Sequence, residues 1–328
     1  MPERLDVKDE RILTALSINA RQSLSSIGRK VGLSEEVVNY RLRNLIKRDV
    51  IAKITVELDS FKLGYKAYRL YIRLEGANAK KEQEIYSYLK NMRGADWIAA
   101  CEGKYNLVFR FMVEDEFGLN RILNDISDKF SSYIRERDLT IPLEWHFYHA
   151  ESGVFHPGGP KYGSLGGRKR VKVDEKDLKI LSILSEDART PSSKIAGQVG
   201  LTPNAVKYRL KRLEKERIIT GYEVMVDRTK IGTFHYKLLV HFRGANEEKV
   251  KRFVRYCEEL PNLVFLVRAI GSWDMDIDLD FKNTVELHNS VLELASKFKD
   301  LVRNYETLSI FKSDYCNPLK EAKKIERG

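Results

Sequence analysis

Apolar residues recur at helical spacing near the start of the chain and again in its second half. One stripe runs over residues 12–16 and its counterpart over residues 180–184. Because residues three and four apart share one face of a helix, each stripe predicts an amphipathic helix. A second short helix, a glycine turn and a third helix are expected after each stripe, which is the order of a helix-turn-helix.

The turns and helix starts carry the residues that this order requires. Gly32 and Gly200 stand at the turns, where a positive φ has little steric cost for glycine. Ser34 and Thr202 are good N-caps for the third helices, and Pro203 suits the first turn of its helix. The sequence therefore predicts two tri-helical units of the DNA-binding type.

Beyond each third helix, apolar and polar residues alternate as in a β-strand. Residues 51–57 and 219–224 are predicted to form the hairpin wing of a winged helix. The stretches that follow have the order β-α-β-β-α-β, which is typical of a ferredoxin-like domain. The predicted elements are 67–74, 80–92, 96–101, 106–113, 117–130 and 134–143 in the first half, and 236–242, 247–259, 264–269, 273–280, 285–298 and 302–311 in the second.

The two halves of the chain are copies of one unit. Adding 168 to a residue number in the first half finds its counterpart in the second, without a gap from about residue 5 to about residue 148. Collinear agreement over this span indicates a duplication, and two copies favour a pseudo-symmetric pair over a solenoid. Matching pairs include Arg21 and Arg189, Tyr40 and Tyr208, Gly64 and Gly232, Asn78 and Asn246, and Gly103 and Gly271.

The predicted fold class is α+β, with two winged helix-turn-helix domains and two ferredoxin-like effector domains in tandem. The expected boundaries place the helix-turn-helix domains at 1–58 and 173–226 and the effector domains at 59–150 and 227–316. Residues 151–172, rich in glycine and basic at their end, are expected to be a flexible linker. Residues 317–328 are expected to be a charged tail.

Composition narrows the class of partner. The chain has 328 residues and a formal net charge of +11, which favours a polyanion such as nucleic acid. Its three cysteines lack CxxC spacing, so neither a disulfide framework nor a cysteine-rich zinc site is indicated. No apolar run approaches the roughly 18 residues of a membrane span, and the charged start does not read as a signal peptide. A cytoplasmic location without a membrane partner is expected.

The outward face of each third helix carries the candidate DNA contacts. The local net charge is +3 over residues 26–49 and +5 over residues 194–217, so the second helix is predicted to bind double-stranded DNA more tightly. Lysine and arginine suit phosphates, and asparagine can read base edges. The alternative is a solvated face that has lost DNA binding. The candidates are Asn39, Tyr40, Arg43, Lys47, Lys53, Asn204, Lys207, Tyr208, Lys211, Arg212 and Lys215.

With these motifs in order, the chain resembles the Lrp/AsnC (leucine-responsive or feast/famine) family of prokaryotic transcription regulators. The resemblance rests on residues 31–34 with Val38, Arg41 and Leu42, and on a glycine turn followed by an aromatic residue, seen at 103–106 and 271–274. It covers nearly the whole chain apart from the linker and the tail. It implies sequence-specific DNA binding, pairing through the sheet of a RAM-type effector domain, and modulation by an amino acid bound near the glycine turn.

Carried onto this sequence, the resemblance gives seven candidate effector contacts. Asn106 stands where the family has an acid, and Trp273 stands where it has tyrosine. The alternative is that these residues only close a β-hairpin at a subunit interface. The candidates are Glu102, Gly103, Tyr105, Asn106, Gly271, Ser272 and Asp274.

The duplication adds an expectation about assembly. If the two effector domains pair within one chain, each monomer mimics a family dimer, as an intrachain pseudo-dimer. Two unlike recognition helices would then read an asymmetric site rather than a palindrome. Further homo-oligomers are also expected from the resemblance.

An enzyme is the competing class. Sirohaem decarboxylases are similar in fold, also occur as two-unit chains, and are expected to use a histidine in the strand before the glycine turn. Residues 96–101 and 264–269 contain none. His146 and His149 lie three apart, but no third metal ligand with matching spacing is visible. No P-loop, nucleophile elbow or dinucleotide fingerprint is found. The prediction is therefore no catalytic residue, no metal and no cofactor, with a sirohaem decarboxylase-like enzyme as the alternative.

Overall fold

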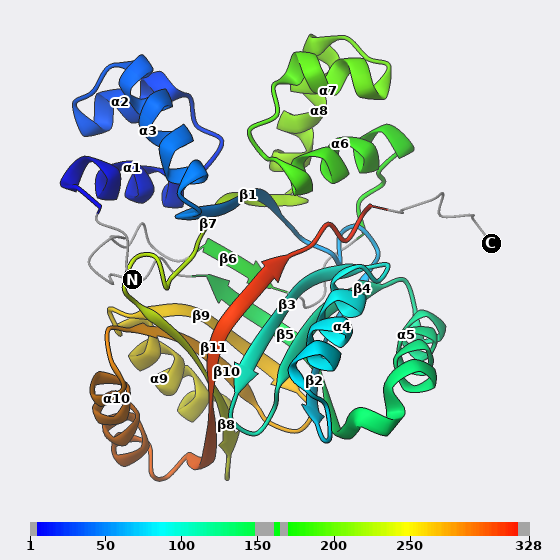
Figure 1. The fold of residues 1–328 in the computed structure, drawn as a ribbon, viewed down its shortest axis with the longest axis vertical. Helices are drawn as coiled ribbons and strands as arrows, with labels where there is room; N and C mark the ends of the chain where they lie inside the picture. Colours follow the sequence, from blue (N-terminus) through cyan, green and yellow to red (C-terminus); the bar gives the residue numbers. More distant parts are fainter. Residues whose placement is uncertain (1–4, 148–160, 165–169, 321–328) are drawn as a thin grey trace.

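The computed structural model describes residues 5–147, 161–164 and 170–320. Two helix-turn-helix units lie side by side above a layer of strands that is flanked by helices (Figure 1). The first unit consists of α1 (Val7–Ile18), α2 (Leu24–Val31) and α3 (Glu35–Lys47), and the second of α6 (Glu175–Glu186), α7 (Ser192–Val199) and α8 (Pro203–Lys215). Within the described part of the chain, no helix has the length and apolar character to cross a membrane.

Local chemistry sets the helix boundaries as predicted. Gly32 and Gly200 end α2 and α7 in the left-handed conformation, with φ of 69° and 62°. The side chain of Ser34 accepts a hydrogen bond from the backbone N–H of Val37 at the start of α3. Thr202 caps α8 in the same way. Each cap satisfies a backbone donor that the helix itself leaves without a partner.

The strands after the third helices correct the predicted wings. β1 (Ile51–Leu58) and β7 (Ile219–Val226) are single strands that pair antiparallel with each other, with Thr55 opposite Glu223. They do not fold back into separate hairpins. After β1 and β7 the chain continues directly into the two effector domains. The backbone groups of β1 that a hairpin partner would have paired are therefore hydrogen-bonded by β7 of the other copy. We call this two-stranded sheet the β1–β7 ribbon; it lies between the helix-turn-helix units and the strands below (Figure 1).

Both effector domains have the predicted β-α-β-β-α-β order. The elements of the first are β2 (Lys66–Leu74), α4 (Ala79–Lys90), β3 (Ala95–Glu102), β4 (Leu107–Val113), α5 (Glu116–Phe130) and β5 (Ile134–Phe147). Those of the second are β8 (Phe234–Phe242), α9 (Glu247–Glu258), β9 (Leu263–Ile270), β10 (Met275–Phe281), α10 (Thr284–Lys297) and β11 (Val302–Tyr315).

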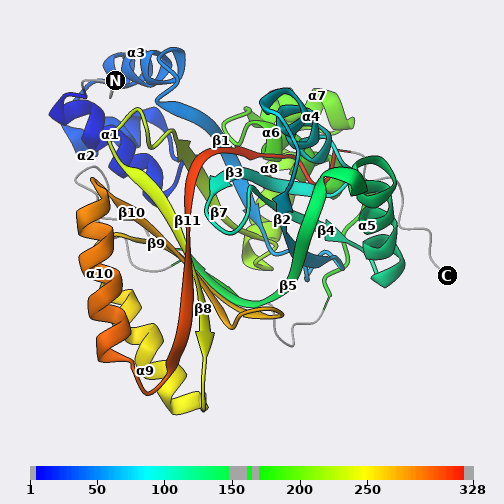
Figure 2. The same ribbon diagram turned by 60° about the horizontal axis from the view of Figure 1, so that its bottom comes forward.

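Eight strands from the two domains close into one ring. Their order is β2-β4-β3-β11-β8-β10-β9-β5, and β5 also pairs with β2. β5 and β11 make the closure possible because each is 14 residues long. Residues 134–140 of β5 pair with β2 and residues 141–147 pair with β9, while β11 pairs first with β8 and then with β3. In Figure 2, α9 and α10 flank one side of the ring and α4 and α5 the other.

Alternation along the strands separates two kinds of core. On β2, Leu70 and Ile72 face outward and pack with buried residues of α4 and α5. Tyr71, between them, faces into the ring and packs with Leu239 and Trp273 of the second domain. The period of two along a strand puts alternate residues on opposite faces. Both faces of these strands are therefore buried, one under helices and one inside the ring.

The linker and the tail are more structured than predicted where the structure describes them. Residues 161–164 form a short strand, β6 (Lys161–Ser164), which pairs with the end of β5. The backbone N–H of Val171 donates to the carbonyl oxygen of Lys62. At the other end, Leu319 is buried and the amide of Asn317 donates to Ser182 on α6. The rest of both segments lies outside the described residues, and so does His149.

Reciprocal arginines join the two helix-turn-helix units. Arg21 donates to the carbonyl oxygens of Ala188 and Thr190 in the second unit. Arg189, its counterpart 168 residues on, donates to the carbonyl oxygen of Ala20 at 2.7 Å in the first unit. Each unit thus contributes one arginine to the other, and the pair holds the two units in one relative arrangement.

The same loops also hydrogen-bond to the ribbon. The backbone N–H of Ala20 donates to the carbonyl oxygen of Tyr222 on β7 at 3.0 Å. The backbone N–H of Ala188 donates to Ile54 on β1 at 2.9 Å. Both bonds cross between the copies, so each helix-turn-helix unit rests on the strand that belongs to the other.

A second repeated arginine ties each third helix to its first helix. Arg41 donates to the carboxylates of Asp6 and Asp9 at 2.8 Å. The backbone N–H of Asp9 and the Arg41 guanidinium hold the pKa of Asp6 below its usual range. Arg209 makes the equivalent bonds in the second unit, to Asp174 and Asp177. In each unit this arginine therefore joins the third helix to the N-terminus of the first.

The glycine turns give the first testable prediction. A Cβ at Gly271 would lie 2.5 Å from the carbonyl oxygen of Leu139, and φ there is 146°. The change Gly271→Ala is expected to lower the free energy of unfolding by about 1–3 kcal/mol, because neither the backbone angle nor the neighbour accommodates a methyl group. Gly197→Ala, at an exposed helical position with open space, is the control and should raise stability by up to about 1 kcal/mol. Equal midpoints in urea denaturation would contradict this role.

The arginine network gives a second prediction. Arg209→Met leaves the carboxylate of Asp177, whose side chain has no exposed surface, with one fewer donor. We expect a loss of about 1–3 kcal/mol in the free energy of unfolding. Tyr208→Ala, next to it in sequence but 72% exposed, should change stability by less than about 0.5 kcal/mol. A similar loss for both variants would show that Arg209 has no special part in the unit.

Candidate nucleic-acid interface

The outward face of α8 is polar and exposed. Asn204, Lys207, Lys211 and Lys215 are all exposed, and Tyr208 between them is 72% exposed. The opposite face buries Val206, Leu210 and Leu213 in the core of its unit. A helix with one apolar face inward presents its other face to whatever lies outside the unit. Among the residues that the structure describes, the lysines of this face take part in no hydrogen bond or ion pair.

The corresponding face of α3 has the same geometry and different residues. Tyr40 is 71% exposed, and Arg43 and Lys47 are exposed too. Asn39 is half-buried. Glu36, at the start of the helix, accepts from its own backbone N–H and from the Ser34 hydroxyl, which holds its pKa below the usual range. A charged carboxylate therefore stands where α8 has the neutral Asn204.

Arg212 has a different environment from the one predicted. Its guanidinium is bonded to the fully buried carboxylate of Asp177. Asp177 also receives Arg209, so both arginines neutralise a charge inside the unit. Arg212 thus pairs with an acid inside the unit, and its contact with DNA stays a prediction.

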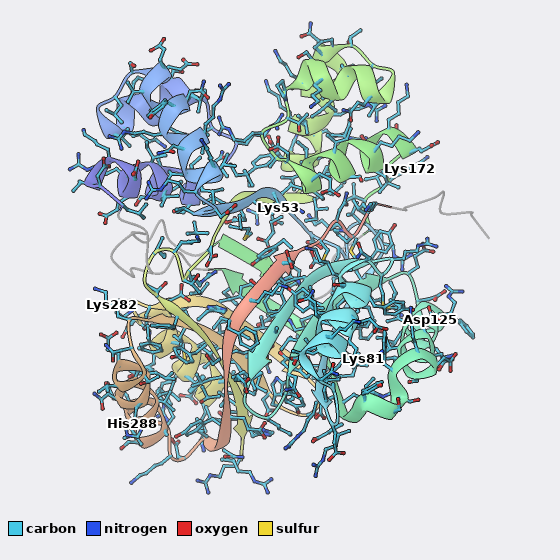
Figure 3. All side chains as sticks on the ribbon, in the orientation of Figure 1. Lys53, Lys81, Asp125, Lys172, Lys282 and His288 are labelled. Atoms are coloured by element: carbon cyan, nitrogen blue, oxygen red, sulfur yellow. The ribbon has the colours of Figure 1, made fainter. Side chains whose placement is uncertain are left out.

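The prediction for Lys53 is corrected. It lies between the helix-turn-helix layer and the strands, where Figure 3 labels it. Its ammonium donates to the carbonyl oxygen of Tyr315 at 3.0 Å and lies 3.9 Å from Glu186. Burial lowers its pKa from the ordinary value. The residue was expected to reach phosphates from the edge of a wing, but the ribbon on which it lies is covered by the C-terminal strand.

The predicted effector residues gather where the two domains meet. Gly103 and Gly271 lie at the β3–β4 and β9–β10 turns, and each packs closely on the last strand of the other domain. A Cβ at Gly103 would lie 2.7 Å from the carbonyl oxygen of Thr307. Both glycines therefore serve close approach between the domains.

Their neighbours are engaged in hydrogen bonds. The Asn106 side chain accepts from the backbone N–H of Leu74, and Asp274 accepts from Phe242, which is the equivalent position in the second copy. These bonds tie each glycine-turn hairpin to the neighbouring strand, β2 in the first copy and β8 in the second. The asparagine in place of an acid leaves the bond intact, because its side-chain oxygen accepts in the same way.

One acid joins the two turns. Asp138 on β5 accepts hydrogen bonds from the hydroxyls of Tyr105 and Ser272. Burial and Asp138 raise the pKa of Tyr105 above its ordinary value. Glu102 lies beside this group and is exposed. The candidate effector residues thus come together across the domain boundary.

Sequence reasoning missed the residues that orient the two recognition helices. Arg21 and Arg189 carry no motif and lie in loops. Their signal was the duplication itself, since an arginine retained at both positions in an otherwise diverged loop stands out once the copies are superimposed.

Models of DNA-binding domains match both helix-turn-helix units. The AsnC-type helix-turn-helix domain matches residues 5–46, and a winged helix-turn-helix DNA-binding domain matches residues 173–220. The two matches fall on α1–α3 and on α6–α8 with the start of β7.

Known regulators resemble single units of this chain. The regulatory protein AsnC of Haemophilus influenzae is 24% identical over 148 residues, which are 45% of this chain and 97% of that protein. The HTH-type transcriptional regulator LrpA of Pyrococcus horikoshii is 47% identical over 94 residues, which are 29% of this chain and 63% of LrpA. A one-unit relative is expected to match about half of a duplicated chain.

The whole arrangement also has a solved counterpart. The sirohaem decarboxylase NirDL, in complex with an iron-uroporphyrin III analogue, superimposes with a TM-score of 0.63 over 96% of this chain and 94% of that one. The sequences are 13% identical, so the match concerns the fold. The helix-turn-helix matches and the named relatives thus make parts of this chain similar to regulators of the Lrp/AsnC family, and the constant offset between its halves indicates a tandem duplication of one unit.

Proposed function

We propose that this protein is a sequence-specific DNA-binding transcription regulator in which one chain supplies both recognition helices. The observation that carries the proposal is the pair of capped third helices, each with a buried apolar face and an exposed polar face. Because Arg21 and Arg189 join the two units, the helices would meet DNA as one preassembled pair.

The chemistry of α8 suits a duplex groove. Lys207, Lys211 and Lys215 supply positive charge along one face, which would bind backbone phosphates and release counterions. Asn204 lies at the start of the helix, the part that contacts base edges in helix-turn-helix complexes. Tyr208 adds an exposed ring at the centre. Simple solvation explains an exposed lysine, but it does not explain an exposed tyrosine at the same position of both helices.

Differences between the helices favour an asymmetric operator. Glu36 in α3 corresponds to Asn204 in α8, and Asn39 corresponds to Lys207. A carboxylate repels phosphate and can accept from a cytosine amino group, whereas lysine attracts phosphate. The two half-sites would therefore differ in sequence, and α8 would contribute more of the affinity.

Effector control and further assembly belong to the same proposal. An amino acid or a related small molecule is proposed to modulate DNA binding, with the group around the glycine turns, Glu102 to Asn106 and Gly271 to Asp274, as the first candidate site. The exposed Glu102 and Ser272 would be its accessible members. Assembly of chains beyond the pseudo-dimer is left to a measurement of mass in solution.

An enzyme like the sirohaem decarboxylases is the second candidate, because the NirDL fold matches this chain almost end to end. Spectral titration with sirohaem separates the two. A regulator should leave the absorption spectrum of sirohaem unchanged and release no carbon dioxide. Stoichiometric binding followed by decarboxylation would overturn the regulator proposal.

The ranking of the two helices is testable at equivalent positions. Lys207→Ala should weaken binding to a selected DNA duplex about tenfold at moderate salt and reduce the slope of log affinity against log salt by about 1. Asn39→Ala, the same change at the equivalent position of α3, should weaken binding less and leave the salt slope unchanged. Fluorescence anisotropy at several salt concentrations measures both. Equal losses would show that α8 is not the dominant helix.

Operator symmetry is a separate prediction. Selection from random duplexes should yield one asymmetric sequence with two unlike half-sites, bound by one chain. A footprint of the Tyr208→Ala variant should lose one half-site, and that of Tyr40→Ala the other, because the rings occupy equivalent places on α8 and α3. Selection of perfect palindromes, or loss of the same half-site in both variants, would contradict the proposal.

A further inference from the structure

A cavity whose wall contains charged side chains lies between the β1–β7 ribbon and the strand ring. Its volume is about 130 Å³, and its wall includes Thr55 and Glu57 of the ribbon as well as residues of both effector domains. It is separate from the glycine turns, none of whose residues line it. The cavity is therefore enclosed by the DNA-binding layer on one side and by the effector layer on the other.

Two cations repeat across this cavity. The guanidinium of Arg69 on β2 lies 5.3 Å from the centre of the Phe265 ring on β9, and the ammonium of Lys237 on β8 lies 6.0 Å from the Trp97 ring on β3. The four residues are related by the offset of 168. Arg69 is 5% exposed and Lys237 2%. Each domain thus supplies one buried cation and places it over an aromatic ring of the other, a favourable arrangement for a desolvated charge.

The rest of the wall breaks this symmetry. Inward-facing positions on β10 carry Asp276, Asp278 and Asp280, all buried. The corresponding positions on β4 carry Val108, Arg110 and Met112. At one pair of equivalent positions, Arg110 and Asp278, the sign of the charge is reversed between the copies.

The acids of β10 hold the cations in place. Asp276 pairs with Arg69, Asp278 with Lys237 at 2.6 Å, and Asp280 with Arg228 at 2.8 Å. Burial alone would raise the pKa of Asp278, but Lys237 and His235 beside it hold that pKa below its usual range. The wall therefore carries ionised groups of both signs.

A wall with buried ion pairs lowers the stability of the folded protein if its role is structural alone. Ion pairs pay a large desolvation penalty when buried, and hydrophobic residues of similar volume often replace them with no loss of stability. A wall of apolar residues would have allowed the ring to close equally well. Charges of both signs around an open cavity, next to the rings of Trp97 and Phe265, form a surface that can bind both ends of a small dipolar molecule.

We propose that this cavity binds a small zwitterion, with its carboxylate held by the cations Arg69, Arg228 and Lys237, its ammonium by Asp278, the acid of β10 that lines the cavity, and an apolar group against Trp97 and Phe265. The assignment rests on the proposed function, since it makes the cavity the place where a ligand acts on the DNA-binding layer. The ribbon forms one wall, and Thr55 donates to Ser185 of α6 while Ala188 donates to Ile54. A ligand that shifts the position of the ribbon would therefore change the orientation of the helix-turn-helix units. This wall is not repeated among the described residues, so we expect one ligand to bind per chain.

The test uses the full-length chain and isothermal titration calorimetry with each of the twenty amino acids. At least one with an apolar side chain should bind with one ligand per chain. Its α-keto acid, which lacks the ammonium, and its decarboxylated amine, which lacks the carboxylate, should each bind at least tenfold more weakly. Failure of all twenty, a stoichiometry of two, or equal binding of either analogue would overturn the proposal.

Two variants locate the site. Arg228→Met removes a cation that is partly exposed and should weaken the ligand at least tenfold. Ser313→Phe narrows the cavity without removing a charge and should do the same, which guards against a folding defect in the first variant. Ser87→Ala, at an exposed position of α4 away from both candidate sites, is the control and should leave affinity unchanged. Full affinity in both cavity variants, with loss of affinity in Ser272→Ala, would place the ligand at the glycine turn and overturn the proposal. Fluorescence anisotropy with DNA, measured without ligand, reports separately on the regulator function. A variant that loses ligand binding can therefore be distinguished from one that loses DNA binding.

Discussion

The pairing of strand edges between the two copies is the constraint on which the rest of the molecule depends. In one effector domain alone, β3 and the second half of β5 would expose rows of unpaired backbone N–H and C=O groups. Such edges are costly to bury and prone to association when exposed. Here β3 pairs with β11 and β5 with β9, so each copy satisfies the edges of the other. The ring cannot form from one copy.

The DNA-binding layer follows the same rule. β1 and β7 pair across the copies, and each helix-turn-helix unit hydrogen-bonds to the strand of the other. The consequence is mechanical. A change in the ring or in the cavity beneath the ribbon therefore acts on the helices, because the contacts that hold the helices are also contacts that hold the two copies together.

Much of this architecture could be predicted from the sequence. Helix boundaries followed from Ser34, Thr202 and the two glycines, because caps and left-handed turns are local. The β-α-β-β-α-β order followed from periodicity, and the constant offset predicted a pseudo-symmetric pair. The fold class is confirmed. The DNA contacts on the exposed faces of α3 and α8 stay predictions.

The wrong predictions share one physical cause, because contacts between residues far apart in the chain give no signal in the local sequence. The alternation at residues 51–57 indicates a strand but not its partner, so a hairpin was expected where the ribbon formed. Lys53 and Arg212 look like surface cations in sequence, and only the tertiary structure brings Tyr315 and Asp177 to them. The acids of β10 did offer a signal, since aspartate alternates there with apolar residues on a strand buried on both faces.

The ion pair between Arg69 and Asp276 also bears on how such a chain can evolve, because it joins the two copies. Two copies of the first unit, assembled as a homodimer, would bury Arg69 twice without that partner, since Val108 stands at the position equivalent to Asp276. Two copies of the second unit would bury Asp276 twice without Arg69, and Lys237, which stands at the equivalent position, already pairs with Asp278. Burying an unpaired charge is strongly destabilising. The two halves have therefore become complementary partners, and neither is expected to form an equally stable homodimer by itself.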